Sequence, residues 1–339
     1  MNRKMPGGDC PPGKEDIAMN RRHALTLMLA AGLVSATAFA QTAGADTLKV
    51  AVGQRGNWDT AVSELGTTAG IFKKHGLELD IVYTQGGGET QQAVISGSAD
   101  VGVAAGTLGV LGAFAKGAPV RILGAQATGA ADFWYARADS KLKSIKDATE
   151  STTVAYSTNG SSTHSIVLAF AKEFGLKAKL TATGSPPATF TQVMSGQIDV
   201  GWSSPPFGFD AIDEGKIRII AHANDASIVH GTTIRMLITN EAALDGKKDA
   251  LIRYMKAYRE TIDWMYAGEA PLKAYAEFAK ATEAQAKRIR DEFFPKGLID
   301  PDKIEGLDRL MEDAVSFKTI AAPLTKEQQT TLVQIPPRT

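Results

Sequence analysis

The sequence predicts an α/β fold with two Rossmann-like lobes joined by a two-strand hinge, and with C-terminal helices packed on the first lobe. Three observations predict it. Residues 76–102 align without a gap on residues 175–201, and ten of the 27 positions are identical. Each copy alternates β-rich runs with helical segments. Beyond a predicted export segment, 299 residues remain, which is more than a single core usually holds.

The N-terminal sequence is typical of a secretory signal peptide. A basic stretch at 21–23 (Arg-Arg-His) precedes an apolar run at 24–34, and small residues lead to Ala-Phe-Ala at 38–40. We therefore expect residues 1–40 to be an N-terminal extension with a cleaved signal peptide, and the mature protein to be periplasmic. A buried N-terminal helix is the alternative.

Composition excludes several classes of function. Without residues 1–40 the chain has 32 Lys and Arg and 34 Asp and Glu, so no nucleic-acid surface is expected. The one cysteine, Cys10, lies in the predicted extension, which excludes disulfides, thiolate metal sites and a cysteine nucleophile from the mature chain. The histidines lack the spacing of a metal site or a triad. We expect no metal, no cofactor, no catalytic residue and hence no enzyme.

Each repeat predicts a strand, a helix, a strand, a helix and a strand, paired in parallel. The predicted strands are 48–52, 78–83 and 100–104 in the first copy, and 152–156, 178–183 and 199–202 in the second. Further strands are predicted at 120–125, 133–137, 217–221 and 233–239.

The chain should cross between the lobes twice, near 128–136 and near 229–236. Lobe 1 would then hold residues 46–128 and 236–339, and lobe 2 would hold residues 136–230. The apolar stripe from Leu251 to Met265 predicts a helix that packs on a core. Further helices predicted at 271–280, 282–293 and 302–317 should cover lobe 1.

Ligands of open α/β sheets bind beyond the carboxyl ends of the strands. Four loops occupy that position, and Arg235 lies on the strand that returns to lobe 1. The expected ligand-binding residues are Gln54, Arg55, Asn57, Trp58, Gly106, Thr107, Thr158, Asn159, Gly160, Ser161, Ser162, Thr163, Trp202, Ser203, Ser204 and Arg235.

The loop at 157–163 is the most informative. Its hydroxyls and its Asn-Gly pair open a helix, so side-chain donors, free N–H groups and the helix dipole can converge on an anion. The alternative is a plain helix cap, because Ser, Thr and Asn are common caps.

Four further side chains have both a binding and a structural interpretation. Arg55 and Arg235 could each bind a carboxylate, nitrate or sulfonate through a bidentate pair of hydrogen bonds, or could be ordinary surface residues. Trp58 and Trp202 occupy comparable loops of opposite lobes and could close over an apolar part of a ligand, or could pack in the core or at the lobe interface. The repeated Asp100 and Asp199 each begin a strand and are expected to hold their own loops.

The ordered set 65–66, 70–77, 86–88 and 96–102 (Leu-Gly, Gly-Ile-Phe-Lys-Lys-His-Gly-Leu, Gly-Gly-Gly, Ser-Gly-Ser-Ala-Asp-Val-Gly) resembles the substrate-binding proteins of nitrate, sulfonate and taurine ABC importers. The resemblance implies a type II periplasmic-binding fold. It also implies a small-molecule anion between the lobes and delivery to the membrane permease of an ABC importer.

Two alternatives remain open at this stage. The same fold serves periplasmic sensory proteins, and a related cytoplasmic branch makes the thiamine pyrimidine with a cysteine-rich motif that this chain lacks. A monomer is expected. The sequence does not identify the solute.

Overall fold

The computed structural model describes residues 45–338, which form one compact unit. The predicted signal peptide and Cys10 lie outside the described residues. Within residues 45–338, no helix combines the length and the apolar character that crossing a membrane requires.

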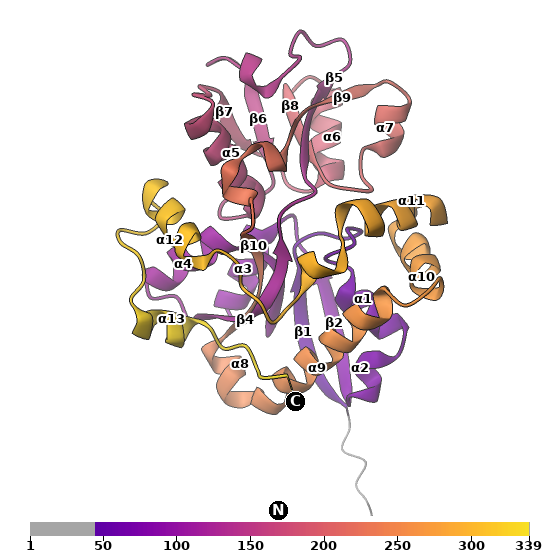
Figure 1. Cartoon of the computed structure of the whole chain (residues 1–339), viewed down its shortest axis with the longest axis vertical. Helices are drawn as coiled ribbons and strands as arrows, with labels where there is room; N and C mark the ends of the chain where they lie inside the picture. The colour runs from indigo at the N-terminus through magenta and orange to yellow at the C-terminus, as the bar shows by residue number, and fades with distance from the viewer. Residues whose placement is uncertain (1–44, 339) are drawn as a thin grey trace, which may run out of the picture. The chain divides into compact units, whose positions relative to one another are not determined.

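Lobe 1 is built on a five-stranded sheet that contains β1 (Asp46–Val52), β2 (Leu77–Tyr83), β3 (Val101–Gly106), β4 (Val120–Thr128) and β10 (Thr233–Asn240). The strand order is β2-β1-β3-β10-β4 (Figure 1). β1 pairs in parallel with β2 and β3, whereas β10 runs antiparallel to β3 and β4. Every residue of β3 and of β10 is buried, as expected for strands covered on both faces.

Lobe 2 repeats this arrangement with β5 (Phe133–Arg137), β6 (Thr153–Tyr156), β7 (Lys179–Ala182), β8 (Val200–Ser203) and β9 (Ile217–His222). The strand order is β7-β6-β8-β5-β9. β6 pairs in parallel with β7 and β8, and β5 runs antiparallel to β8 and β9. The two sheets therefore have the same order, as the internal repeat requires.

The antiparallel strand of each sheet comes directly from the crossing between lobes. β5 follows β4 after a short connection and enters the second sheet, and β10 returns to the first sheet after β9. Each sheet thus holds one strand supplied by a crossing segment. The predicted two-lobed α/β fold with a two-strand hinge is confirmed, and the residue boundaries of the two lobes stay a prediction.

The helices cover both faces of each sheet. Lobe 1 has α1 (Val62–Thr68), α2 (Ile71–Lys74), α3 (Gly87–Ile95), α4 (Thr107–Ala115), α8 (Glu241–Gly246), α9 (Lys248–Met265), α10 (Ala270–Ala279), α11 (Glu283–Arg288), α12 (Leu307–Ser316) and α13 (Lys326–Leu332). Lobe 2 has α5 (Ser162–Glu173), α6 (Pro186–Met194) and α7 (Phe209–Asp213).

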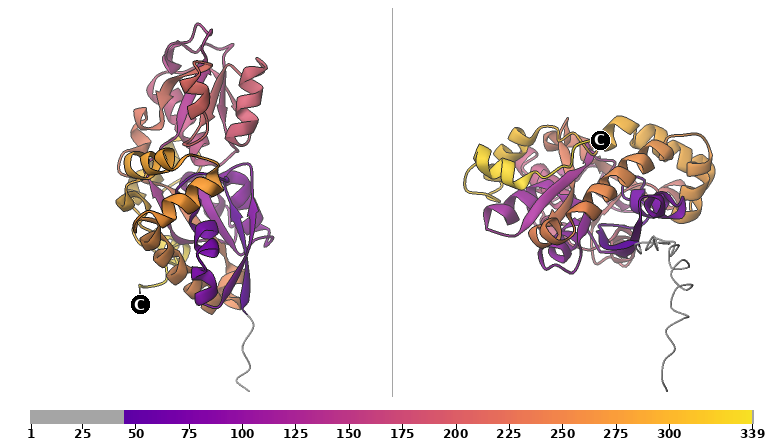
Figure 2. Two further views of the ribbon diagram at one scale, coloured as in Figure 1. Left: turned by 90° about the vertical axis from the view of Figure 1, so that its right-hand side faces the viewer. Right: turned by 90° about the horizontal axis from the view of Figure 1, so that it is seen from below.

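The predicted C-terminal helices lie on lobe 1. The buried stripe of α9, which includes Leu251, Met255 and Tyr258, packs in one core with Leu48 and Val50 of β1. Figure 2 shows the orange C-terminal segment beside the indigo and purple strands of this sheet. The helix predicted at 282–293 begins as expected, and its second half, Ile289–Phe293, is a π-helical turn.

The repeated Asp100 and Asp199 have a structural role at the starts of β3 and β8, where we expected them to hold their own loops. The Asp100 carboxylate accepts the Lys49 N–H and the Lys247 ammonium group, each at 2.8 Å. The Asp199 carboxylate accepts the N–H and the hydroxyl of Thr153, each at 2.8 Å. Each aspartate therefore ties the strand it precedes, β3 or β8, to the first strand of its own repeat, β1 or β6.

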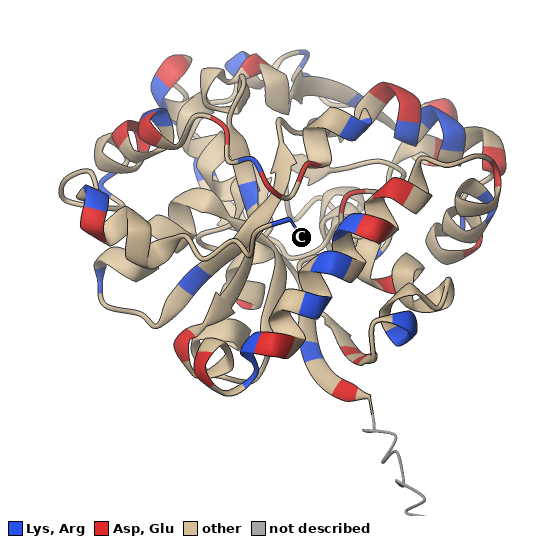
Figure 3. Cartoon of the chain, turned by 60° about the horizontal axis from the view of Figure 1, so that its bottom comes forward, with Lys and Arg blue, Asp and Glu red and all other residues tan. Residues whose placement is uncertain are grey.

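Lys and Arg positions are interspersed with Asp and Glu positions along the ribbon drawn in Figure 3. Several helices carry both signs. The distribution of charged residues along the chain in this view does not single out a binding region, so the site has to be located from its cavity and its buried groups.

The core of lobe 2 gives the first testable prediction. Phe170 of α5 is fully buried, and its ring meets the edge of Trp134 at a centroid distance of 5.0 Å. Phe170→Ala should lower the free energy of unfolding by about 3–5 kcal/mol, because it removes buried area and leaves a cavity. Urea denaturation measures this. Val82→Ala is the control, since Val82 is 49% exposed and should shift stability by no more than about 0.5 kcal/mol. A loss below about 1 kcal/mol for Phe170→Ala would contradict this packing.

Candidate ligand-binding site between the lobes

A small polar cavity lies where the carboxyl ends of strands from both lobes meet. Its volume open to the centre of a water molecule is about 10 Å³, enough for roughly one water-sized group. We call it the polar cavity. It is lined by Gly53, Gln54, Asn57, Thr60, Gly87, Ala104, Asp132, Ser157, Ser161, Ser162, Thr163, Trp202 and Arg235.

The lobes touch directly around the polar cavity. The Gly88 N–H of α3 donates to the Thr158 hydroxyl of lobe 2 at 2.9 Å, and the Ser185 N–H donates to the Gln85 side chain at 3.3 Å. A Cβ placed on Gly88 would overlap the Asn159 carbonyl oxygen. Gly86 and Gly88 therefore allow the two lobes to approach closely, because a side chain at either position would hold the lobes apart.

The centre of the site is Arg235, on β10, between two buried carboxylates. Its Nη1 donates to Asp59 at 2.9 Å, its Nη2 is paired with Asp132, and its Nε donates to the Ser162 hydroxyl at 3.0 Å. Gln126 donates to the same Asp59 carboxylate at 3.0 Å. The Asp59 and Asp132 side chains are fully buried, and that of Arg235 is 7% exposed. We call Asp59, Asp132 and Arg235 the buried triad.

The triad joins segments that are far apart in the sequence. Asp59 follows β1 in lobe 1, Asp132 lies in the crossing between β4 and β5, and Ser162 begins α5 in lobe 2. Its formal charge with all three groups ionised is −1. Burial raises the pKa of the Asp132 carboxyl above its usual range, and the nearby Asp59 charge raises it further, while Arg235 opposes the rise.

Three buried acceptor atoms beside Arg235 lack a partner within residues 45–338. They are the second carboxylate oxygens of Asp59 and Asp132 and the side-chain oxygen of Asn57. Asp132 and Asn57 line the polar cavity. A buried acceptor without a donor costs free energy, so these atoms mark the place where a bound group would donate hydrogen bonds.

The N-terminus of α5 supplies donors to the same cavity. Ser161 caps the helix by accepting the His164 N–H at 3.1 Å, and the Thr163 hydroxyl accepts the Ser157 N–H at 3.0 Å. The N–H groups of Ser162 and Thr163 have no partner in the described chain, as the first turn of a helix leaves them free. The helix dipole adds positive potential there.

His164 supports this turn in its neutral form. Its Nδ1 accepts the Gly160 N–H at 3.2 Å, and its ring stacks on Tyr156 with centroids 4.4 Å apart. Burial lowers the pKa of His164 below its ordinary value. The imidazole therefore acts as an acceptor that fixes the loop.

The structure brings together part of the predicted set. The predicted residues that line the polar cavity are Gln54, Asn57, Ser161, Ser162, Thr163, Trp202 and Arg235. Arg235 was expected to offer a free guanidinium to an anion. In the structure each of its three nitrogens already donates to another side chain of the protein.

Trp58 does not reach the polar cavity. It is fully buried in lobe 1, where its indole N–H donates to Tyr266 at 3.0 Å and its ring packs on Tyr275 at 4.8 Å. The expected pair of tryptophan walls is therefore wrong, since only Trp202 lines the cavity. The reason is that α10 and the end of α9 supply aromatic partners for Trp58, which the sequence does not reveal.

The other predicted residues do not line the polar cavity. Arg55 lies in a separate hollow at the lobe boundary, with its guanidinium 4.3 Å from the Phe278 ring centre. Gly160 approaches the Gly106 backbone, and the Thr107 hydroxyl donates to Thr233. The remaining predicted residues do not line the polar cavity either; they are Thr158, Asn159, Ser203 and Ser204.

Sequence reasoning missed Asp59 and Asp132. Asp59 directly follows the predicted loop at 53–58, and Asp132 lies inside the predicted crossing, so position alone could have suggested both. Their burial beside Arg235 depends on the meeting of distant segments. The other lining residues outside the prediction are Gly53, Thr60, Gly87, Ala104 and Ser157.

Comparison with known proteins identifies the family to which the chain belongs. A model of the family described as NMT1/THI5 like matches residues 63–270, which is more than half of the chain. The chain belongs to the NMT1/THI5-like family. The predicted resemblance to substrate-binding proteins is thereby confirmed. No curated protein matches this NMT1/THI5-like chain by sequence.

Solved structures share the fold of this NMT1/THI5-like chain. The alkanesulfonate-binding protein SsuA from Xanthomonas axonopodis pv. citri, bound to MOPS, has a TM-score of 0.67 at 17% identity, covering 86% of this chain and 98% of that one. The periplasmic aliphatic sulphonate binding protein SsuA from Escherichia coli has a TM-score of 0.58 at 16% identity, covering 86% and 93%.

A Candida albicans protein with the generic periplasmic binding protein fold has a TM-score of 0.67 at 13% identity, covering 85% of this chain and 96% of that one. At such identities the likeness shows the fold alone. It agrees with the two lobes described above, and the chemistry of this chain's site has to be argued from its own residues.

The glycine contact between the lobes predicts the effect of a small side chain. Gly88→Ala should hold the lobes apart and weaken binding of any solute in the polar cavity by at least about tenfold, or roughly 1.4 kcal/mol. Small-angle scattering and calorimetric titration measure both effects. Gly297→Ala is the control, because the space beside Gly297 is open. Identical scattering profiles and affinities for both variants would rule out this role.

The buried triad predicts a pH-dependent defect. Arg235→Met leaves two carboxylates buried without a cation and should cost about 3–5 kcal/mol of stability at neutral pH. The loss should shrink as the pH falls, because burial raises the pKa of Asp132 and Arg235 is no longer there to oppose the rise. The folded variant then takes up a proton on Asp132 and has one buried charge instead of two.

Chemical denaturation between pH 7 and pH 5 tests this expectation. Arg137→Met is the control, since it removes an ion pair at the surface and should change stability little at either pH. A defect in Arg235→Met that grows at low pH would contradict the arrangement.

Proposed function

We propose that this chain is the solute-binding component of an ABC importer and works in the periplasm. Its solute would bind between the lobes, in the polar cavity. The observation that carries the proposal is the convergence of α5 donors, unpaired acceptors and the buried triad on one point where both lobes meet. Membership in a family that resembles such binding proteins supports it.

The solute carries an anionic group. The free N–H groups of Ser162 and Thr163 at the start of α5 are suited to an oxyanion, with the helix dipole behind them. Each charge-assisted hydrogen bond contributes about 1.5–3 kcal/mol, and micromolar affinity requires about 8 kcal/mol. A few such bonds and the exclusion of water supply that amount.

The same solute also carries a hydrogen-bond donor, preferably a cationic nitrogen. The triad has a formal charge of −1, and the unpaired oxygens of Asp132 and Asn57 line the cavity. An anion alone would be repelled by the excess carboxylate and would leave these acceptors unpaired. A solute that offers both an acceptor group and a donor group satisfies the two sides together.

Binding and release follow from closure of the lobes. The crossings at β4–β5 and β9–β10 are the only covalent links between the sheets within the described chain, so they can act as the hinge. The closed lobes would present a continuous surface to a membrane permease. We also propose that the protein is a monomer and not an enzyme, since the ionisable triad is engaged in internal pairs.

A matched set of compounds tests the proposed solute chemistry. 2-Aminoethanesulfonate should raise the unfolding temperature more than ethanesulfonate, and ethylamine should raise it least. A bound solute at 100 times its dissociation constant adds about 2.7 kcal/mol. Native mass spectrometry of the freshly purified protein should also detect a co-purified solute.

Two variants sharpen this test. Asp132→Asn should abolish the preference for the amino compound, whereas Asp139→Asn should retain it, because the Asp139 side chain is 68% exposed. If no solute co-purifies and no anionic or zwitterionic compound shifts the unfolding temperature, the proposed function fails.

A further inference from the structure

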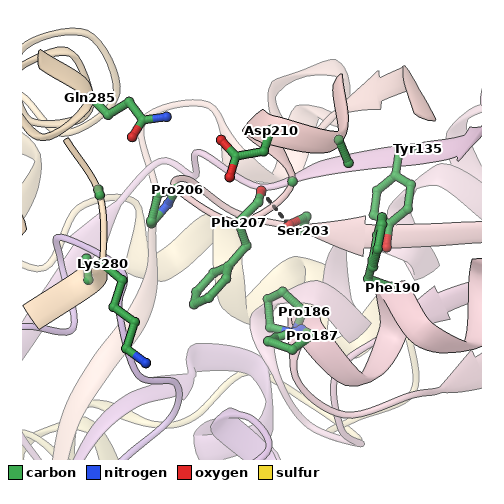
Figure 4. Close-up of a pocket in the computed structure, with 14 residues that line it drawn as sticks. Tyr135, Pro186, Pro187, Phe190, Ser203, Pro206, Phe207, Asp210, Lys280 and Gln285 are labelled. Carbon is green, nitrogen blue, oxygen red and sulfur yellow. Dashed lines mark hydrogen bonds between the residues drawn. The ribbon is translucent and has the colours of Figure 1, made fainter. Parts of the chain in front are cut away.

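An apolar chamber lies apart from the polar cavity, and of the predicted ligand-binding residues only Ser203 lines it. Its volume is about 390 Å³, within the range of small-molecule sites. Figure 4 shows it between lobe 2 and the segment that joins α10 to α11. It is lined by Tyr135, Pro186, Pro187, Phe190, Ser203, Pro206, Phe207, Gly208, Asp210, Ala211, Ala279, Lys280, Ala281 and Gln285.

The chamber presents mainly carbon. Pro186, Pro187 and Phe190 of α6 form one side, and the Phe207 ring forms another (Figure 4). Rings and proline faces of this kind pack well against an aromatic or branched apolar group. The polar groups labelled around them in Figure 4 include Lys280 and Asp210.

One buried polar atom in the wall has no partner. Tyr135 is 1% exposed, and its hydroxyl makes no hydrogen bond within residues 45–338. Burial raises the pKa of this hydroxyl, so it stays a neutral donor. A polar atom of an occupant that reached this hydroxyl would give it the partner it lacks.

A third hollow, of about 310 Å³, shares lining residues with both the chamber and the polar cavity. This hollow shares Pro186, Pro187, Phe207, Ala279 and Lys280 with the chamber, and it shares Gln54 with the polar cavity. The three spaces therefore follow one another along the boundary between the lobes.

We infer that the chamber holds the apolar body of the solute whose charged group occupies the polar cavity, and that this body is an aromatic or comparably bulky ring. The inference rests on the proposed function. The polar cavity has room for about one water-sized group, so the rest of any larger solute must extend elsewhere. The chamber, at about 390 Å³ and with a mainly apolar lining, has room for such a ring.

Phe207 connects the chamber to closure of the lobes. Its ring lies so close to the lobe 1 loop that a Cβ on Gly56 would be 2.9 Å from it. Lys280, from the end of α10, lines both the chamber and the connecting hollow. A ring in the chamber would therefore contact both lobes, and its burial would favour the closed arrangement.

Matched pairs of zwitterions test the inference by calorimetric titration of the full chain, because each pair keeps the acceptor and the donor that the proposed function requires. 2-Amino-2-phenylethanesulfonate should bind at least about tenfold more tightly than 2-aminoethanesulfonate, and phenylalanine should bind more tightly than alanine, because the ring buries apolar area. Ala211→Trp fills the chamber and should bring 2-amino-2-phenylethanesulfonate down to the affinity of 2-aminoethanesulfonate. The affinity of 2-aminoethanesulfonate itself should not change.

Two further variants keep the test decisive. Phe190→Ala, which enlarges the chamber at a partly buried position, should also weaken only the ring compounds. Ala242→Trp is the matched control, since Ala242 is exposed on α8, and it should behave as the wild type does.

The outcomes separate the inference from the proposed function. If the compounds without a ring bind and the ring adds nothing, or if filling the chamber weakens neither class, the inference is overturned and the proposed function stands. If neither class binds and no solute co-purifies, both are overturned.

Discussion

The ion-paired contact of Arg235 with Asp59 and Asp132 is the interaction on which the rest of the site depends. It joins a loop of lobe 1, the first crossing and the returning strand β10, and through Ser162 it reaches lobe 2. Three charges placed out of water remain ionised only when they pair closely, because isolated buried charges are very costly. Their geometry therefore constrains how the two lobes can meet.

The same contact decides what the site can bind. An arginine with free donors would bind an oxyanion through two hydrogen bonds. Here the guanidinium already donates to two carboxylates and a hydroxyl. The positive potential for an anion then comes from the backbone of α5, and the excess carboxylate favours a donor. A charge-neutral or zwitterionic group fits this balance better than a bare anion does.

Close approach of backbones sets the size of the polar cavity. Gly88, Gly106 and Gly109 face the 159–161 backbone so tightly that a side chain at any of them would overlap it. The closed lobes leave room for about one water-sized group at the triad and a much larger space beside Phe190 and Phe207. The polar cavity is therefore suited to recognising polar groups and the chamber to burying apolar groups, and both lie along the boundary between the lobes.

The sequence by itself determined the two-lobed α/β architecture and the loops that could form a site. An alignment of 27 positions at an offset of 99 residues indicates two similar units, and the period-2 and period-3.6 patterns place their strands and helices, because both signals can be read from the sequence. It also placed Asn57, Ser161–Thr163 and Trp202 at the cavity, since loops after parallel strands meet at one edge.

Only the tertiary structure decided how β5 and β10 insert into their sheets, which carboxylates neutralise Arg235, and why Trp58 packs in the core of lobe 1. Asp59, Asp132 and Arg235 are up to 176 positions apart, and nothing in their local sequence encodes burial against one another. Such contacts arise when distant segments are packed together, and the free energy of a buried charge depends on all of them at once.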